Sequence, residues 1–284
     1  MNWGVRSLTV RFGARCALRD VTFEAAPGEV RGVVGGDGAG KTTLVRALVG
    51  AIGHAQGEVR RPPAREIGYM PAGSGVFQDL SVDENLAFTA AAYGMPRAER
   101  DERATQLLER TGLLDARKRL GGELSGGMRQ KLGVLLAMLH GPSLLVLDEP
   151  TTGVDPLSRA DLWRLIAQAA SEGAQVVLST SYLDEAERTS QLLFLQAGRA
   201  LASGTAADVV RAMPGRVRWA PERPPGDALE RSWRRGASWR IWTPPGVSEE
   251  RKDWEAVSPD LQDAVTVAAL AHELQGAHQG GASQ

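Results

Sequence analysis

The sequence predicts an α/β fold in which helices cover a mostly parallel sheet. Strand-like and helix-like stretches alternate along most of the chain. A glycine-rich loop at 35–40 separates an apolar strand-like stretch from a helix-like one, and residues 144–147 form a continuous apolar run typical of a buried parallel strand. Such alternation is typical of parallel strands joined by helices.

Caps, turn residues and apolar periodicity place the elements in order. Ser81 and Glu84 form a capping box, Ser125 is a helix N-cap and Pro156 suits a first helical turn. We expect strands at 5–12, 18–25, 30–35, 66–70, 144–147, 175–180 and 191–195. We expect helices at 41–49, about 82–93, 96–111, 125–140, from 156 onward and at 260–275.

Composition divides the chain into a large domain and a small appendage. The sheet domain is expected at 1–213, with a mainly helical subdomain inserted at about 73–140. Five of the seven tryptophans follow residue 213. Because aromatic side chains fill a thin core, residues 214–275 are expected to form a β-rich accessory domain. Residues 276–284 are expected to be a flexible tail.

Composition also excludes several classes of protein. The 33 basic and 34 acidic residues nearly cancel, which excludes a global basic field, and no nucleic-acid partner is expected. A single cysteine, Cys16, excludes an internal disulfide and a thiolate-rich zinc site. The apolar run at 132–139 is far shorter than the roughly 20 residues that span a bilayer, and no signal peptide is evident. We therefore expect an intracellular protein that reaches a membrane only through a partner.

The glycine-rich loop carries a phosphate-binding motif. Residues 35–42, Gly-Gly-Asp-Gly-Ala-Gly-Lys-Thr, match the P-loop pattern G-x-x-x-x-G-K-[ST] between a strand and a helix. Backbone N–H groups of such a loop wrap a phosphate, and the helix N-terminus favours its charge. Lys41 is expected to reach the β- and γ-phosphates, and Thr42 to bind Mg²⁺. A glycine-rich turn with a surface lysine is the disfavoured alternative.

Two acidic residues end the apolar strand. Asp148 and Glu149 stand at its carboxyl end, where α/β sheets place their ligand sites. Asp148 is expected to hold Mg²⁺, directly or through water, and Glu149 to be the general base for an attacking water. Many strands end in acidic residues, so the signal is strong only beside a P-loop.

A second glycine pair begins a later helix. In Leu124-Ser125-Gly126-Gly127-Met128, two glycines start a capped helix, whose N-terminus also favours anions. An ordinary serine N-cap after a loop is the alternative.

Together the three motifs resemble the ATP-binding cassette (ABC) family of ATPases, over about residues 1–213. The resemblance implies a P-loop NTPase core that binds ATP and Mg²⁺. It implies that Phe12 stacks on adenine, with a core phenylalanine as the alternative, and that Asp155 belongs to a loop that communicates across a dimer. Family members dimerise head to tail, so residues 125–127 would act on the nucleotide of the partner chain.

The resemblance thus carries a set of site residues onto this chain. The catalytic residues implied are Glu149, Lys41 and Asp148, and the metal ligands are Thr42 and Asp148. The nucleotide-binding residues implied are Phe12, Gly35, Gly36, Asp37, Gly38, Ala39, Gly40, Lys41, Thr42, Thr43, Ser125, Gly126, Gly127 and Asp155.

Two positions depart from the family pattern. The family usually carries glutamine where this chain has Ala72, and a switch histidine where it has Ser181. Gln78 is too distant along the chain to assume that it replaces the glutamine. Serine can hydrogen-bond a γ-phosphate but has no imidazole to position water. We therefore expect slow turnover, with a harmless variation at the two positions as the alternative. None of the four histidines stands close to Ser181 in sequence: His54, His140, His272 and His278.

Residues 198–205 and 259–264 look like those of export-type cassette subunits. The resemblance implies an ATP-hydrolysing exporter subunit on the cytoplasmic face of the cell membrane, with a membrane-spanning permease and a second cassette subunit, identical or different. The permease groove is expected around 72–80. A slow nucleotide-binding clamp and a non-transport cassette ATPase remain as alternatives, and the cargo is not identified.

Overall fold

The computed structural model describes residues 1–247, 251 and 253–280. The chain divides into two compact units, Met1–Ala200 and Leu201–Gln284. The domain boundary expected at residue 213 stays a prediction. Within the described residues, no helix is long and apolar enough to cross a membrane.

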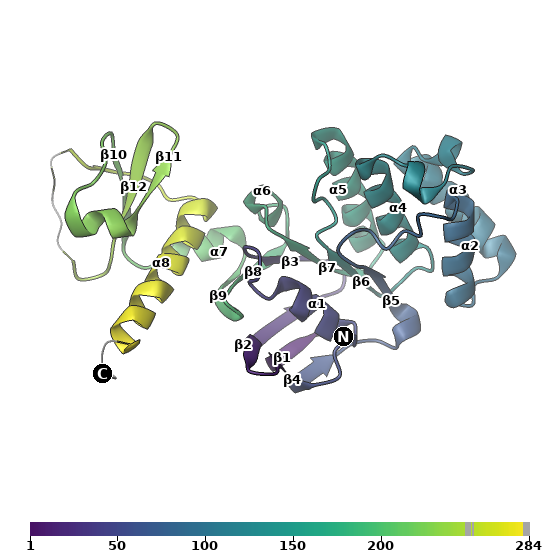
Figure 1. Ribbon diagram of the computed structural model, residues 1–284, viewed down its shortest axis with the longest axis horizontal. Helices are drawn as coiled ribbons and strands as arrows, with labels where there is room; N and C mark the ends of the chain where they lie inside the picture. The colour runs from purple at the N-terminus through teal and green to yellow at the C-terminus, as the bar shows by residue number, and fades with distance from the viewer. Residues whose placement is uncertain (248–250, 252, 281–284) are drawn as a thin grey trace. The chain divides into compact units, whose positions relative to one another are not determined.

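A six-stranded sheet forms the centre of the first unit (Figure 1). Its strands are β3 (Val30–Val34), β5 (Ile67–Met70), β6 (Leu144–Asp148), β7 (Gln175–Thr180), β8 (Gln191–Gln196) and β9 (Arg199–Gly204). They lie in the order β5-β6-β7-β3-β8-β9. The pairs β5–β6, β6–β7, β7–β3 and β3–β8 are parallel, as the sequence predicts.

A smaller antiparallel sheet lies beside the first helix of this unit (Figure 1). It is formed by β1 (Trp3–Phe12), β2 (Arg15–Ala25) and β4 (Ala55–Arg60), in the order β2-β1-β4. Strand β4 was not expected from the sequence. None of its residues, AQGEVR, is fully buried, and its two apolar side chains, Ala55 and Val59, stand four positions apart, so they show no apolar alternation.

The helices begin and end at the residues that cap them. They are α1 (Lys41–Leu48), α2 (Val82–Ala92), α3 (Arg97–Thr111), α4 (Gly126–Met138), α5 (Pro156–Ser171) and α6 (Leu183–Ala186). The capping box of Ser81 and Glu84 is present at α2. Gly112, with φ 67°, ends α3 in the left-handed conformation that glycine adopts without strain.

Two apolar clusters cover the two faces of the large sheet. Alternate residues of β6 point to opposite faces: Leu144 and Val146 pack with α1 and the small sheet, whereas Leu145 and Leu147 pack with α4 and α5. All four side chains are fully buried. A strand buried on both faces explains the continuous apolar run in the sequence.

The second unit contains a four-stranded sheet and two helices. Its strands are β10 (Arg216–Ala220), β11 (Ser232–Arg235), β12 (Ser238–Thr243) and β13 (Glu255–Ala256), in the order β11-β12-β10-β13. The helices are α7 (Ala206–Arg211) and α8 (Leu261–Gly280). Trp242 and Trp254 are buried, so tryptophans do fill this thin core. Helix α8 extends beyond the expected end at 275, and residues 281–284 of the expected tail lie outside the described residues.

A buried carboxylate fixes the start of α8. Asp263 is fully buried, and its Oδ1 lies 3.2 Å from Arg235 Nη1 and 3.8 Å from Arg240 Nε. Arg235 also pairs with Asp260. A buried charge requires such partners, because its desolvation is otherwise costly.

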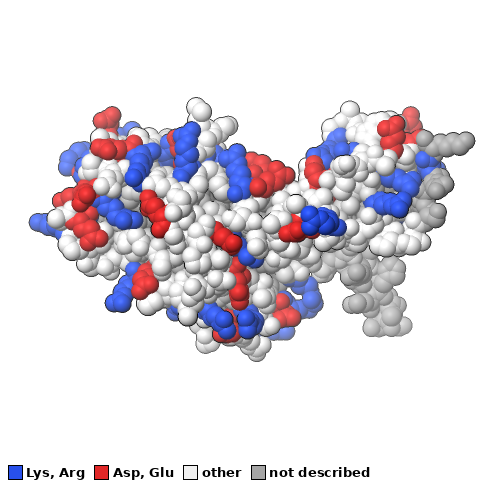
Figure 2. Space-filling model, turned by 180° about the vertical axis from the view of Figure 1, so that it is seen from behind, with Lys and Arg blue, Asp and Glu red and all other residues white. Residues whose placement is uncertain are grey.

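Charged side chains of both signs are interspersed over the face of the molecule in Figure 2. This agrees with the formal net charge of −1.

Candidate functional site

The glycine-rich loop links β3 to α1 in a conformation that requires glycine at both of its ends. A Cβ at Gly35 would lie 2.3 Å from the Leu195 carbonyl oxygen. Gly40 has φ 109°, and a Cβ there would lie 2.8 Å from Leu18 and 2.9 Å from the Ala17 carbonyl. The loop therefore folds tightly against its neighbours, and its backbone N–H groups lead into the N-terminus of α1.

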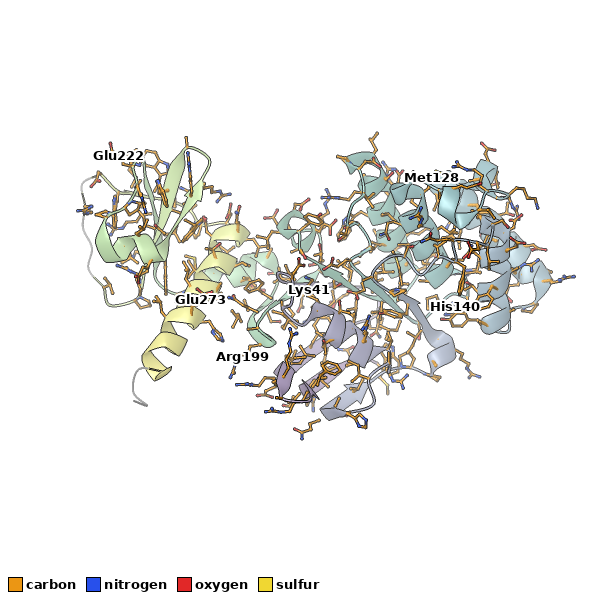
Figure 3. The ribbon with its side chains drawn as sticks, in the orientation of Figure 1. Lys41, Met128, His140, Arg199, Glu222 and Glu273 are labelled. Atoms are coloured by element: carbon orange, nitrogen blue, oxygen red, sulfur yellow. The ribbon has the colours of Figure 1, made fainter. Side chains whose placement is uncertain are left out.

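A cavity of about 730 Å³ opens over this loop. Its walls come from the β1–β2 hairpin, the loop, the first turn of α1, the end of β6 and the turn after β8. Among the predicted site residues, it is lined by Phe12, Gly36, Asp37, Gly38, Ala39, Gly40, Lys41, Thr42, Thr43 and Glu149. Figure 3 places Lys41 at the start of α1, whereas Met128, next to the second glycine pair, lies among the helices of the unit.

One aromatic ring stands exposed at the wall of the cavity. Phe12 is 56% exposed, although it ends a strand whose other large apolar residues are mostly buried. An exposed phenylalanine next to a phosphate-binding loop is suited to stack on a flat ring.

The Lys41 side chain is buried and surrounded by acceptors. Its Nζ donates to the Gly35 carbonyl at 2.8 Å, the Gly36 carbonyl at 3.1 Å and Ser181 Oγ at 2.9 Å. Glu149 Oε1 lies 3.0 Å away as an ion-pair partner. Lys41 is only 5% exposed, so its charge is held close to the loop.

Asp148 lies at the carboxyl end of β6 and is fully buried. Its Oδ1 accepts from Ser179 Oγ at 2.6 Å and from Thr42 Oγ1 at 3.3 Å. Its Oδ2 is buried and has no hydrogen-bond partner among the described residues. A hydroxyl beside a carboxylate with a free oxygen is the kind of donor set that Mg²⁺ takes, so these two residues fit the metal.

Glu149 occupies an unusual backbone conformation. Its φ is 53°, and its N–H donates to Ser179 Oγ at 3.0 Å. A non-glycine residue there stores strain, of about 1–3 kcal/mol, that the neighbouring contacts must hold. Burial raises the pKa of the Glu149 carboxyl, but its contacts with Lys41, Thr152 and Ser181 outweigh burial and hold that pKa below its ordinary value.

The second glycine pair and Asp155 lie next to each other, and none of them lines the cavity. Ser125 caps α4 and accepts a backbone N–H of its first turn at 3.3 Å. A Cβ on Gly127 would lie 2.8 Å from Ser158 Oγ and 3.2 Å from Asp155 Oδ2. Gly126 has more room, since its nearest neighbour would be 3.8 Å away.

The two departures from the family pattern differ in their surroundings. Ser181 contacts Lys41 and Glu149, two residues that line the cavity. Ala72 is exposed and does not line the cavity.

One of the four histidines, His140, is engaged elsewhere in the fold. It stacks on Tyr93, with ring centroids 3.6 Å apart.

Several residues of the cavity were missed from the sequence. Arg15, Cys16 and Ala17 follow Phe12 in the β1–β2 hairpin, so the proximity of that aromatic was an available signal. The turn at Ala197 and Gly198 also lines the cavity. Its glycine indicates a turn, but only the tertiary fold places it beside the loop, where Gly198 N–H donates to the Ala39 carbonyl at 3.0 Å.

Comparison with known proteins identifies the family. Residues 18–152 match the family described as ABC transporter. The chain is 41% identical over 207 residues to the probable multidrug ABC transporter ATP-binding protein YbhF of Escherichia coli, which covers 69% of this chain but 36% of that protein. It thus spans about a third of the length of that relative.

Other relatives match over more of their length. The Nod factor export ATP-binding protein I of Cupriavidus metallidurans is 34% identical over 217 residues, 72% of each chain. The doxorubicin resistance ATP-binding protein DrrA of Mycobacterium tuberculosis is 36% identical over 217 residues, 72% of this chain and 65% of that protein.

A solved structure shares the fold. The structure of an ATP binding subunit of an ABC transporter matches with a TM-score of 0.68 and 30% identity, over 74% of this chain and 92% of that one. With a parallel sheet, a glycine-rich loop and these relatives, the chain belongs to the ABC transporter family.

Proposed function

We propose that this chain hydrolyses ATP as a subunit of an exporter and drives a membrane-spanning partner. The observation that carries the proposal is the cavity over the glycine-rich loop, where backbone donors, the buried Lys41 and the Glu149 carboxylate meet, next to the buried Asp148 that contacts Thr42. Ligands of open α/β sheets bind at the carboxyl ends of the strands.

Each part of the cavity has a role in binding. Phe12 would stack on the adenine, because its exposed ring lines the wall. The N–H groups of residues 36–43 would hold the phosphates, with Lys41 on the terminal ones. Thr42 and Asp148 would hold Mg²⁺, which when bound neutralises charge on the β- and γ-phosphates.

Glu149 would orient and deprotonate the attacking water. Its carboxylate lies at the cavity wall, next to the metal ligand Asp148. A positioned general base of this kind contributes roughly 10²- to 10⁴-fold in rate. In this proposal Glu149 must first leave Lys41, with which it is paired.

The second glycine pair would act on the nucleotide of another cassette subunit. Ser125, Gly126 and Gly127 lie at the N-terminus of α4 and outside the cavity of their own chain. Such an N-terminus favours a phosphate. Asp155 lies beside Gly127, which is consistent with a joint role in a head-to-tail dimer.

A second hollow suits the membrane partner. Apolar and aromatic side chains of the loop after β5 and of α2 surround a cavity of about 180 Å³. Phe77 and Phe88 are 49% and 54% exposed, and their rings meet edge to face at 4.8 Å. Exposed aromatic pairs mark protein interfaces. We place the partner here, and the chain on the cytoplasmic face of its membrane.

A nucleotide-binding clamp with slow turnover is the second candidate. The contacts of Ser181 favour it, because this hydroxyl engages both Lys41 and Glu149 where the family usually has histidine.

Titration with a fluorescent ATP analogue tests the proposal. Lys41→Ala removes the buried cation and should weaken binding by roughly 10- to 100-fold, the worth of hydrogen bonds to a charged group. Lys118→Ala is the matched control, because Lys118 is 90% exposed, pairs with Asp83 and does not line the cavity. Equal affinity of the wild type and Lys41→Ala would contradict the proposal.

A further inference from the structure

Ser181 lies in a closed triangle of polar side chains. Its Oγ accepts from Lys41 Nζ at 2.9 Å and donates to Glu149 Oε1 at 3.3 Å. The third side is the Lys41–Glu149 ion pair at 3.0 Å. The hydroxyl therefore joins the cation and the carboxylate instead of contacting only one of them.

Lys41 has more acceptors than donors. An ammonium carries three N–H donors, and four oxygens lie within 3.1 Å of Lys41 Nζ. A phosphate oxygen that binds this nitrogen must displace at least one of the four. Two are backbone carbonyls of the loop itself, at Gly35 and Gly36. The other two, on Ser181 and Glu149, belong to side chains that can rotate away.

The segment that carries Ser181 is fixed on both sides. Thr180 Oγ1 donates to the buried Glu185 Oε2 at 2.6 Å and accepts the Tyr182 N–H at 3.0 Å. Arg159 lies over the Tyr182 ring, 4.6 Å from its centre. The Ser181 hydroxyl is thus presented to Lys41 by a rigid backbone.

We propose that Ser181 is a positioning residue that holds Lys41 against Glu149 and so competes with phosphate for Lys41. Glu149 is released for its role as a base only when a phosphate takes the lysine. This inference rests on the proposed function, because it requires the loop to bind nucleotide. In this role Ser181 weakens phosphate binding, whereas a serine that contacted the phosphate would strengthen it.

The two roles give opposite results for Ser181→Ala. If Ser181 competes with phosphate, its removal frees Lys41 and tightens binding of both ADP and a non-hydrolysable ATP analogue. If Ser181 binds the γ-phosphate, its removal weakens the ATP analogue and leaves ADP unchanged, because ADP lacks that group.

Calorimetric titration of the full chain with Mg-ADP and with Mg-AMP-PNP measures both affinities. We expect Ser181→Ala to bind each about three- to tenfold tighter, as loss of one competing hydrogen bond of ordinary net strength predicts, because the Glu149 carboxylate still competes for Lys41. Ser181→Thr keeps the hydroxyl and should bind like the wild type. Ser171→Ala is the matched control, since that serine bonds to the Gln168 carbonyl within α5 and does not line the cavity.

A double-mutant cycle measures the coupling between Ser181 and Glu149 in ADP binding. A merely structural role of Ser181 would give no such coupling. Glu149→Gln removes the ion pair and should also tighten ADP binding. Because Ser181 and Glu149 act on the same lysine, the double variant should gain less than the product of the two single effects. Additive effects would overturn the coupling.

The outcomes separate this inference from the proposed function. Unchanged ADP affinity in Ser181→Ala, or weaker binding of the ATP analogue, overturns the competition. If Lys41→Ala binds nucleotide as well as the wild type does, the proposed function itself fails, whatever the Ser181 variants show.

Discussion

The cavity over the glycine-rich loop and the N-terminus of α4 both suit phosphate, but they differ in how their polar groups are used. At the cavity, Lys41 pairs with Glu149, and Ser179 Oγ contacts both Asp148 and the Glu149 N–H within the same chain. At α4, the Ser125 cap serves a single backbone N–H, and nothing would lie nearer than 3.8 Å to a Cβ on Gly126. The polar groups of the first site are thus paired within the chain, whereas Gly126 at the second leaves the space that our proposal assigns to a phosphate of another chain.

The start of α5, beside the N-terminus of α4, carries an exposed apolar side chain. Leu157, the second residue of α5, is 81% exposed, although it is a large apolar residue. It follows Asp155, which caps α5 by accepting from the Leu157 and Ser158 N–H groups.

The largest effect is expected from a change to Glu149, the proposed general base. Glu149→Gln keeps the shape of the side chain but removes the acceptor of the water proton. ATP binding should persist, while hydrolysis slows by roughly 10²- to 10⁴-fold. Phosphate release measures the rate, and Glu172→Gln on the surface is the control, because its side chain bonds to Gln168 and Arg110 and does not line the cavity. If wild-type turnover is already negligible, the slow clamp becomes the better description.

A negative charge at the N-terminus of α4 tests the second of the two sites. Gly126→Asp fits the free space there and puts a carboxylate where a phosphate of the partner chain would lie. Nucleotide affinity of the single chain should stay within about twofold of the wild type, while hydrolysis falls by roughly 10²-fold, as for loss of an anion-binding group.

Gly126→Ala is the control, since it adds a methyl group without charge. Size-exclusion chromatography with ATP would report dimer formation directly. Reduced nucleotide binding by the single-chain Gly126→Asp variant would show that α4 serves its own cavity, contrary to the comparison.

Replacing both Ala72 and Ser181 by the residues that the family usually carries tests whether these two positions limit hydrolysis in the cavity. Ala72→Gln with Ser181→His replaces the groups that the family usually carries, and should raise the ATPase rate by roughly tenfold, a small part of a full general-base contribution. Each change alone should do less, because residues that act as a unit are non-additive. Histidine is larger than serine, so circular dichroism must confirm folding. A folded double variant no faster than the wild type contradicts the prediction.

The smallest effect concerns a region that serves neither phosphate site. Burial lowers the pKa of His140 to about 4, from 6.5, and the Arg103 charge adds to this. Between these values the unfolded chain binds a proton that the folded chain does not, so stability falls as pH drops through this window. His140→Phe retains a ring to stack on Tyr93 and removes the proton.

Melting temperatures from pH 7.5 to 4.5 check this. Over that range the wild type should lose about 2–4 °C more than His140→Phe. Parallel pH profiles of the two proteins would contradict the assignment, because other groups titrate equally in both.

How much the sequence could predict depends on how local each feature is. The P-loop, the pair Asp148 and Glu149, and the Ser125 cap are short motifs, and the structure places each at the end of the expected element. Strand β4 was missed because its residues show no apolar alternation. The contact of Lys41 with Ser181 joins residues 140 positions apart, so no local pattern could reveal it.

Cys16 gives the cavity a built-in reporter. It is the single cysteine of the chain, it lines the cavity, and its half-buried thiol donates to the Leu18 carbonyl at 3.2 Å. A thiol-reactive dye would therefore attach beside the proposed adenine position without any engineered residue. Occupancy of the cavity becomes readable in the unmodified sequence, as protection from labelling or as a change in fluorescence.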